Sequence, residues 1–170
     1  MFIYYEKHFD FVTVCFIMFM MNKNKFMLSA LEEAEKALKS GEIPVGCVIA
    51  NKEKIISRAF NMRETHMNAL YHAEILAIEE ACKKVNDWRL TDFDIYVTLE
   101  PCMMCAGAIL NARLRRVYFG AYDERAGGIR YIEEKITNKE EKIEIYGGIC
   151  IEECEAVLKK FFNGVRRKSP

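Results

Sequence analysis

The segment from residue 94 to residue 112 constrains the fold most, because it predicts a buried strand that leads directly into a helix. Residues 94–99 are rich in β-branched and aromatic side chains, which favour a strand. Pro101 follows at the point where a helix would begin, and proline suits the first turn of a helix. Residues 102–112 are then predicted to be helical. A strand that runs into a helix is the building unit of α/β folds.

The rest of the chain alternates short apolar strands with amphipathic helices. The apolar residues of 27–38 and 72–85 recur at three- and four-residue steps, which is typical of helices that bury one face. Further helices are predicted over 102–112 and 151–162, and strands over 45–50, 54–60, 94–99, 116–121 and 143–146, the last with a short helix as an alternative. The first two strands form a hairpin. This order predicts an α/β fold with a mixed sheet covered by helices on both faces.

Length and charge limit the classes of function that remain. A chain of 170 residues can bury roughly two-thirds of its unfolded surface, so one domain forms a core without disulfides. Its 25 basic and 25 acidic side chains give a net charge of +0, which argues against coating nucleic acid by bulk charge. Any contact with phosphates must therefore be local. Seven cysteines, an odd number, indicate a reducing compartment, and we expect a cytoplasmic protein.

The N-terminal residues differ in character from the rest of the chain. Residues 11–21 are apolar but fall short of the about 20 residues needed to cross a bilayer. Glu6 and Asp10 make the stretch a poor signal peptide. We therefore expect an apolar N-terminal extension over residues 1–21, arising from a start codon placed too far upstream, and a single domain over residues 22–170. The alternative is a genuine extra helix, strand or peripheral anchor, and only then is membrane contact expected.

Two short motifs carry chemistry, and each opens a predicted helix. They are His72-Ala73-Glu74 and Pro101-Cys102-Met103-Met104-Cys105. Two cysteines three positions apart in a first helical turn can direct both sulfurs at one ion. The helix N-terminus favours thiolate because its free N–H groups carry partial positive charge. Two thiolates and the His72 imidazole make three ligands for a tetrahedral Zn²⁺, with the fourth position open to water or hydroxide.

Three protein ligands and an open position are typical of a catalytic zinc site rather than a structural one. Glu74 can share the pocket of His72 only if the histidine lies at the entry of its helix, because residues two apart lie on opposite sides of a regular helix. Zinc lowers the pKa of bound water to about 7. We therefore predict that Glu74 is the catalytic proton shuttle, taking a proton from water and delivering it to a ring nitrogen and then to a departing amine.

These motifs match the H-x-E…P-C-x-x-C signature of zinc deaminases. From residue 27 to residue 168 the chain resembles the zinc-dependent cytidine and deoxycytidylate deaminase superfamily, and within it the bacterial tRNA-specific adenosine deaminases most closely. Further matching segments are Pro44-Val45-Gly46, Asn61 with Arg63-Glu64, Trp88-Arg89-Leu90, residues 96–102, Phe119-Gly120-Ala121, and Phe161-Phe162 with Arg166-Arg167. The resemblance implies a three-layer α/β/α sandwich with a central mixed sheet, a homodimer, and hydrolysis of adenosine to inosine at the wobble position of a tRNA anticodon stem-loop.

The resemblance also implies roles for single residues. One Zn²⁺ per chain is held by His72, Cys102 and Cys105, and Glu74 moves the proton. The implied substrate contacts are Asn61 on the base or ribose, Val45 as an apolar wall of the base pocket, and Asp123 on a flanking nucleotide. A protein of neutral charge that acts on RNA also needs a local basic patch, for which the candidates are Arg166, Arg167 and Lys168.

Two segments depart from the family pattern and keep alternatives open. Residues 68–71 read Asn-Ala-Leu-Tyr where the family usually has Asp-Pro-Thr-Ala, and residues 129–140 also differ. A deaminase of free nucleobases or nucleosides, such as guanine, cytosine or cytidine, is therefore the alternative enzyme. The alternatives of another class are a silent deaminase subunit or a structural zinc module. The module would use Cys102, Cys105, Cys150 and Cys154, and would leave His72 and Glu74 without a role.

Overall fold

The computed structural model describes the backbone of residues 11–135 and 143–166, and the side chains of residues 25–132 and 143–165. The described helices are α1 (Phe11–Lys39), α2 (Ala73–Val85), α3 (Met103–Asn111), α4 (Ile129–Lys135) and α5 (Ile151–Arg166). The described strands are β1 (Gly46–Ala50), β2 (Ile55–Phe60), β3 (Asp94–Leu99), β4 (Arg116–Ala121) and β5 (Glu144–Tyr146).

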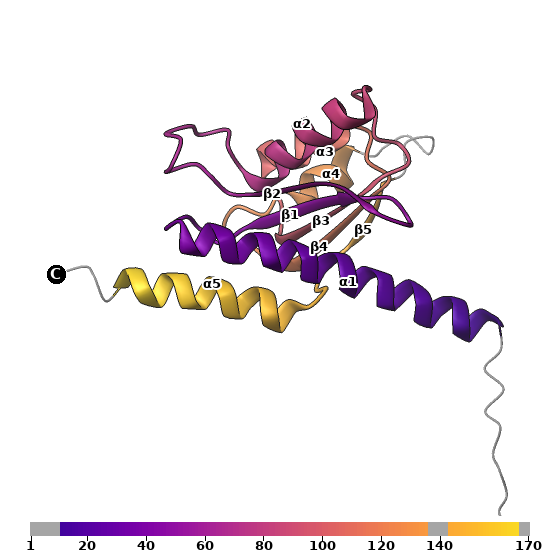
Figure 1. Cartoon of the computed structure of the whole chain (residues 1–170), viewed down its shortest axis with the longest axis horizontal. Coiled ribbons are helices and arrows are strands. Elements are labelled where there is room, and N and C mark those ends of the chain that lie inside the picture. Colours follow the sequence, from indigo (N-terminus) through magenta and orange to yellow (C-terminus); the bar gives the residue numbers. More distant parts are fainter. Residues whose placement is uncertain (1–10, 136–142, 167–170) are drawn as a thin grey trace, which may run out of the picture.

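The strands form one five-stranded mixed sheet in the order β2-β1-β3-β4-β5. β1 pairs antiparallel with both β2 and β3, whereas β3 with β4 and β4 with β5 pair parallel. Helices α2, α3 and α4 cover one face of the sheet, and α1 and α5 lie on the other face (Figure 1). The predicted three-layer α/β/α sandwich with a central mixed sheet is confirmed.

The sheet separates two apolar cores, because successive side chains of a strand point to opposite faces. On β3, Ile95 and Val97 pack with α2, α3 and α4, while Tyr96 packs with α1 on the other face. Tyr96 stacks on Tyr118 with ring centroids 4.6 Å apart. All five residues of β1 are buried, as expected for a central strand covered on both faces.

A glycine brings β1 against α1. A Cβ atom at Gly46 would overlap the backbone carbonyl oxygen of Ala30 and the backbone nitrogen of Ala34, so no larger residue fits there. The Gly46 N–H donates to Thr98 Oγ1 on β3 at 3.1 Å. This packing fixes the start of β1, which lies at the same sheet edge as the end of β3.

The structure adds elements that the sequence pattern did not predict. Residues 129–135 form the short helix α4, whose Ile129 and Ile132 join the core beneath α3. Residues 144–146 are a strand rather than the alternative short helix. Helix α1 runs without a break across the predicted boundary between residues 21 and 22. Within the described residues, no helix combines the length and apolar character that a membrane span requires.

Candidate metal centre and active site

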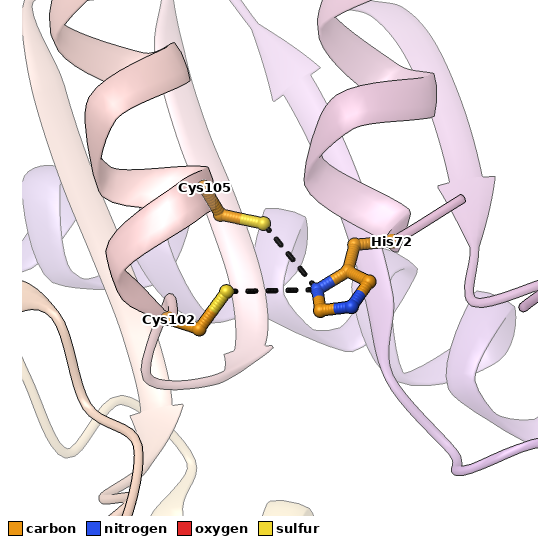
Figure 2. Close-up of side chains that lie close together, drawn as sticks. All are labelled: His72, Cys102 and Cys105. Carbon is orange, nitrogen blue, oxygen red and sulfur yellow. Dashed lines mark hydrogen bonds between the residues drawn. The ribbon is translucent and has the colours of Figure 1, made fainter. Parts of the chain in front are cut away.

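The two chemical motifs meet at the N-termini of α2 and α3. His72 is the N-cap of α2 (φ −74°, ψ 150°), and Cys102 is the N-cap of α3 (φ −70°, ψ 171°). An N-cap side chain commonly accepts a hydrogen bond from the first helical turn. Neither His72 nor Cys102 does so in the structure. Both side chains are instead directed at each other and at Cys105 (Figure 2).

The distances among these three side chains suit a metal ion. Nδ1 of His72 lies 3.7 Å from Cys102 Sγ and 3.5 Å from Cys105 Sγ. A tetrahedral zinc with ordinary Zn–S and Zn–N bond lengths separates nitrogen from sulfur by about 3.6 Å. All three candidate ligand atoms lie within 4.8 Å of one another. Among the described residues, this imidazole and two sulfurs therefore form a group that could hold a metal ion.

The cysteines share their protons unequally in the metal-free site. The hydrogen bonds from Cys105 and His72 lower the pKa of Cys102 to about 4. The hydrogen bond to the Cys102 thiolate and burial raise the pKa of Cys105 well above its usual range. The hydrogen bond to Cys102 also raises the pKa of His72. Cysteine binds metals as thiolate, so a metal ion that binds here would displace any proton that these two sulfurs carry.

Glu74 lies in the first turn of α2 and is almost completely buried, at 4 % exposed. Burial raises its pKa, and the negative charge on Cys102 acts in the same direction, against the opposing effect of His72. Because His72 precedes the helix in an extended conformation, the two side chains share one pocket, which was the condition set by the sequence. A carboxyl group with a raised pKa is suited to accepting and returning protons.

A cavity of about 260 Å³ opens beside these groups. Its size suits a single planar ring system better than a larger ligand, since the pockets that bind drug-sized ligands have volumes of about 300–1,000 Å³. The lining residues precede β1, follow or end β2, β3 and β4, or lie at the starts of α2 and α3. They are Ile43, Val45, Asn61, Arg63, His72, Ala73, Glu74, Leu99, Glu100, Cys102, Asp123 and Ala126. Val45, Asn61 and Asp123, predicted from different segments, therefore lie around the same cavity as Glu74.

One side of the cavity is held by a carboxylate that the sequence analysis did not identify. Glu42 is fully buried and accepts hydrogen bonds from Asn61 Nδ2 at 3.1 Å, Glu64 N at 3.2 Å and Thr65 N at 2.7 Å. Burial alone would raise its pKa, but hydrogen bonds from Thr65 and Glu64, together with the charge of His66, lower it. The only sequence signal was an acidic residue just before an apolar strand, which is too common to single out.

The opposite side is a loop fastened to the start of α3. Asp123 Oδ1 accepts the backbone N–H groups of Arg125 and Ala126, both at 3.0 Å, and Glu100 Oε2 accepts the N–H of Asp123 at 3.1 Å. Gly128 donates its N–H to the Pro101 carbonyl at 2.7 Å. The predicted contact residue Asp123 therefore also closes a turn within its own loop. Arg63 and Glu100 were not predicted to line the site.

The remaining candidates lie away from the centre or outside the described residues. Cys154 is buried in the core beneath α1, against Gly120 of β4, on the face of the sheet opposite to α3. The four-cysteine site of the structural alternative is therefore not formed. Arg166 ends α5, its side chain is not described, and Arg167 and Lys168 lie outside the described residues. Of the two divergent segments, 68–71 is part of the loop before α2, and 129–140 includes α4 over 129–135, while its residues 136–140 lie outside the described residues.

Comparisons with known proteins agree with this geometry. A family model described as MafB19-like deaminase matches residues 21–166. The tRNA-specific adenosine deaminase of Rickettsia bellii is 47 % identical over 146 residues, which cover 82 % of this chain and 99 % of the relative. The Bacillus subtilis enzyme of the same name is 42 % identical over 147 residues, covering 84 % and 90 %.

Solved structures give the same result. A structure from work on A-to-I editing by tRNA:A34 deaminases at the wobble position of tRNA aligns with a TM-score of 0.73 and 37 % identity, over 79 % of this chain and 99 % of that one. A guanine deaminase from Nitrosomonas europaea aligns with a TM-score of 0.71 over 81 % and 83 % of the chains. Its 19 % identity indicates a shared fold only.

Proposed function

Because the chain belongs to the MafB19-like deaminase family, among its tRNA-specific adenosine deaminases, we propose that it hydrolyses adenosine to inosine at the wobble position of a tRNA anticodon. The observation that carries this proposal is the meeting of Glu74 with His72, Cys102 and Cys105 at one cavity. The reaction consumes one water and releases one ammonia for each adenosine converted.

His72, Cys102 and Cys105 would hold one Zn²⁺ per chain, and a water molecule beside them would be the reactant. The bound ion supplies Lewis-acid activation of that water near neutral pH. Glu74 would accept the proton that the attacking water loses and give it to a ring nitrogen of the base. It would then take the hydroxyl proton of the resulting adduct and pass it to the amine, which leaves as ammonia. The burial and raised pKa of this carboxyl group support its part in each transfer.

The other cavity residues would hold the base and its neighbours. Val45 offers an apolar wall to the ring, Asn61 a hydrogen-bonding amide to the base or ribose, and Asp123 a contact to a flanking nucleotide. Bases in an anticodon loop are already unstacked or easily splayed out, so placing one in a closed cavity costs less than extracting it from a duplex. We further propose a cytoplasmic protein, since the proposed substrate is a tRNA, with a deaminase domain over residues 22–170 and an N-terminal extension over residues 1–21.

A second copy of the chain would cover the surface beside the metal ligands. Met103, which follows a proposed ligand directly, is 65 % exposed, and Leu70 is 58 % exposed. They border an apolar groove of about 410 Å³ whose other lining residues are Ile75, Met104, Gly107, Ala108, Asn111 and Tyr131. In the homodimer, Met103→Glu is expected to lower the molar mass measured by light scattering. Leu28→Glu on α1 should leave it unchanged.

One assay tests the proposed reaction against its alternatives. The purified protein is incubated in parallel with tRNA, adenosine, cytidine, cytosine and guanine, and ammonia release is measured. We expect release from tRNA together with inosine at the wobble position. Release from a free base or nucleoside alone would contradict the proposal and favour the alternative enzyme. No release from any substrate would favour a silent subunit.

The basic C-terminal residues Arg166, Arg167 and Lys168 are the proposed local contact to RNA phosphates. Truncation before Arg166 should weaken tRNA binding and lower its salt dependence, by a slope of about 0.7 for each lost contact to single-stranded RNA. Fluorescence anisotropy at several salt concentrations measures both quantities. An unchanged slope would remove these residues from the proposed RNA surface.

A further inference from the structure

We propose that Glu42 is a positioning residue that fixes the orientation of the Asn61 side chain at the substrate cavity. The proposal deepens the deaminase function above and rests on it for the identity of the substrate. Glu42 itself does not line the cavity. It would act on the substrate only through the residues that it holds.

The surroundings of Glu42 differ from those of an ordinary buried acid. An ionised carboxylate can be buried at tolerable cost only if hydrogen bonds replace its hydration. Among the described residues, the hydrogen-bond donors to Glu42 include the backbone N–H groups of Glu64 and Thr65 and the Asn61 amide, and the charge of His66 also lowers its pKa. The backbone groups close the loop after β2, whereas the amide belongs to a residue that lines the cavity. The third bond is therefore directed at a residue of the proposed binding site.

The chemistry of a carboxylate decides which way this amide faces. A carboxylate only accepts hydrogen bonds, whereas an asparagine amide can donate through nitrogen or accept through oxygen. Facing Glu42, Asn61 must present its Nδ2, as the 3.1 Å bond shows. Its Oδ1 then remains the acceptor available for a donor of the substrate, such as a ribose hydroxyl or an amino group of the base. Glu42 thus selects one of the two amide orientations.

The backbone reinforces this arrangement. Asn61 donates its own N–H to the Val45 carbonyl at 2.9 Å, which ties the end of β2 to the cavity wall at the start of β1. Glu42 bonds to the N–H groups of residues 64 and 65, which follow the cavity residue Arg63. These bonds fix the backbone of Asn61. The Glu42 carboxylate then determines how the side-chain amide of Asn61 is oriented.

The first test does not depend on the substrate. Nuclear magnetic resonance of ¹⁵N-labelled protein reports the side-chain Nδ2 group of Asn61, assigned by its loss in Asn61→Ala. Glu42→Gln keeps size and shape but replaces an acceptor oxygen by a donor, so the Asn61 resonances should shift and its amide protons exchange faster. Unchanged Asn61 resonances would overturn the proposal. If Glu42→Gln does not fold, Glu42→Asp, which is shorter but keeps its charge, takes its place with the same expected changes.

The second test measures whether the effect on substrate passes through Asn61. Glu42→Gln should lower kcat/KM for a tRNA anticodon stem-loop by about tenfold, the loss expected for one hydrogen bond to a charged group. In an Asn61→Ala background the same change should lower kcat/KM by less than about twofold. Single-turnover assays with excess enzyme keep weak variants measurable. An equal fall in both backgrounds would show a general structural role and overturn the proposal.

A matched control separates positioning from stability. Glu33 is also buried, at 3 % exposed, but bonds Lys36 and Arg58 on the other side of the sheet. Glu33→Gln should lower the melting temperature without changing kcat/KM or metal content. If the wild-type protein releases no ammonia from tRNA, the proposed function fails by itself. The resonance test still decides the position of Asn61, and the kinetic cycle is then run with the free base or nucleoside that reacts.

Discussion

The two sides of the cavity are built in different ways. The metal side comes from the N-termini of α2 and α3, where His72, Cys102 and Cys105 occupy the cap or first turn of a regular helix. The substrate side comes from residues 61–65 and 123–128, which are loops held by the carboxylates Glu42 and Glu100. Helix geometry thus fixes the chemical groups, while long-range hydrogen bonds fix the groups that would contact the substrate.

This difference predicts which substitutions should affect metal binding and which should affect substrate binding. Damage to a helix N-terminus should remove metal and chemistry whatever the substrate. Damage to a loop anchor should leave the metal in place and alter substrate affinity or choice. Variants on either side, or between the two, should therefore differ in their effects on metal binding and on substrate.

Removing the metal should have the largest effect. Chelation, or His72→Ala, should abolish ammonia release while the sheet and its helices remain folded. Because burial and the hydrogen bond to Cys102 raise the pKa of Cys105, metal binding is expected to displace a proton from this sulfur. Zinc affinity should therefore fall as the pH is lowered from about 8 to about 6, by about tenfold per pH unit for each proton displaced. Calorimetry in buffers of different ionisation enthalpy counts these protons, and pH-independent affinity would contradict the prediction.

Glu74→Ala should lower the rate by on the order of 10²–10⁴-fold, the usual contribution of general acid–base catalysis. Zinc content, measured by atomic absorption, and the melting temperature should change little. Glu79→Ala on the exposed side of the same helix is the matched control, because its carboxylate is exposed and pairs with Lys83. Activity in Glu74→Ala close to that of the control would remove Glu74 from the mechanism.

Gly128 lies where the two sides meet, so its substitution should affect both. A Cβ atom there would lie 2.5 Å from Met103 N and 2.6 Å from the Cys102 carbonyl carbon. Gly128→Ala should therefore lower the free energy of unfolding by about 1–3 kcal/mol and weaken zinc binding, since the ligand loop must shift. Gly164→Ala is the control, because nothing lies within 4 Å of its added Cβ. Denaturant titration and zinc competition measure the two effects; equal values for both variants would contradict the expectation.

Glu100→Gln should have the smallest effect and leave the metal untouched. This substitution replaces the carboxylate that accepts the Asp123 N–H by a neutral amide, so the loop of residues 123–128 is held less firmly. We expect kcat/KM for the anticodon stem-loop to fall by about fivefold, on the scale of about 1 kcal/mol for one hydrogen bond, mainly through KM. Loss of zinc from this variant would break the division between the two sides.

The same division explains how much of the molecule could be predicted from sequence. β3 and β4 were predicted with their observed bounds, because buried strands are continuous apolar runs bounded by polar residues. The metal group was predicted because its members lie within short motifs at helix starts. The role of Glu42 was missed because the groups that donate hydrogen bonds to it belong to residues 61–65. The sequence around Glu42 does not indicate these contacts.

Helix α4 was missed for a related reason. It has seven residues, and among its described side chains Ile129, Tyr131 and Ile132 pack on the core, which is too short a pattern to separate a helix from a loop. The order of the strands in the sheet could not be predicted either, because β1 pairs with β3 although β2 and α2 lie between them in the sequence. Local patterns therefore predicted elements and ligands, whereas the contacts between distant segments required coordinates.

The uncapped starts of α2 and α3 carry a cost for the whole protein. Serine or aspartate at position 72 or 102 would accept a helix N–H and stabilise its helix by about 1 kcal/mol. His72 and Cys102 accept no such hydrogen bond, so the first turns of α2 and α3 are less stable than they would be with a capping side chain. A substitution that stabilises either helix in this way would remove one of the candidate metal ligands, so selection for stability and selection for the proposed reaction would oppose each other at these two positions.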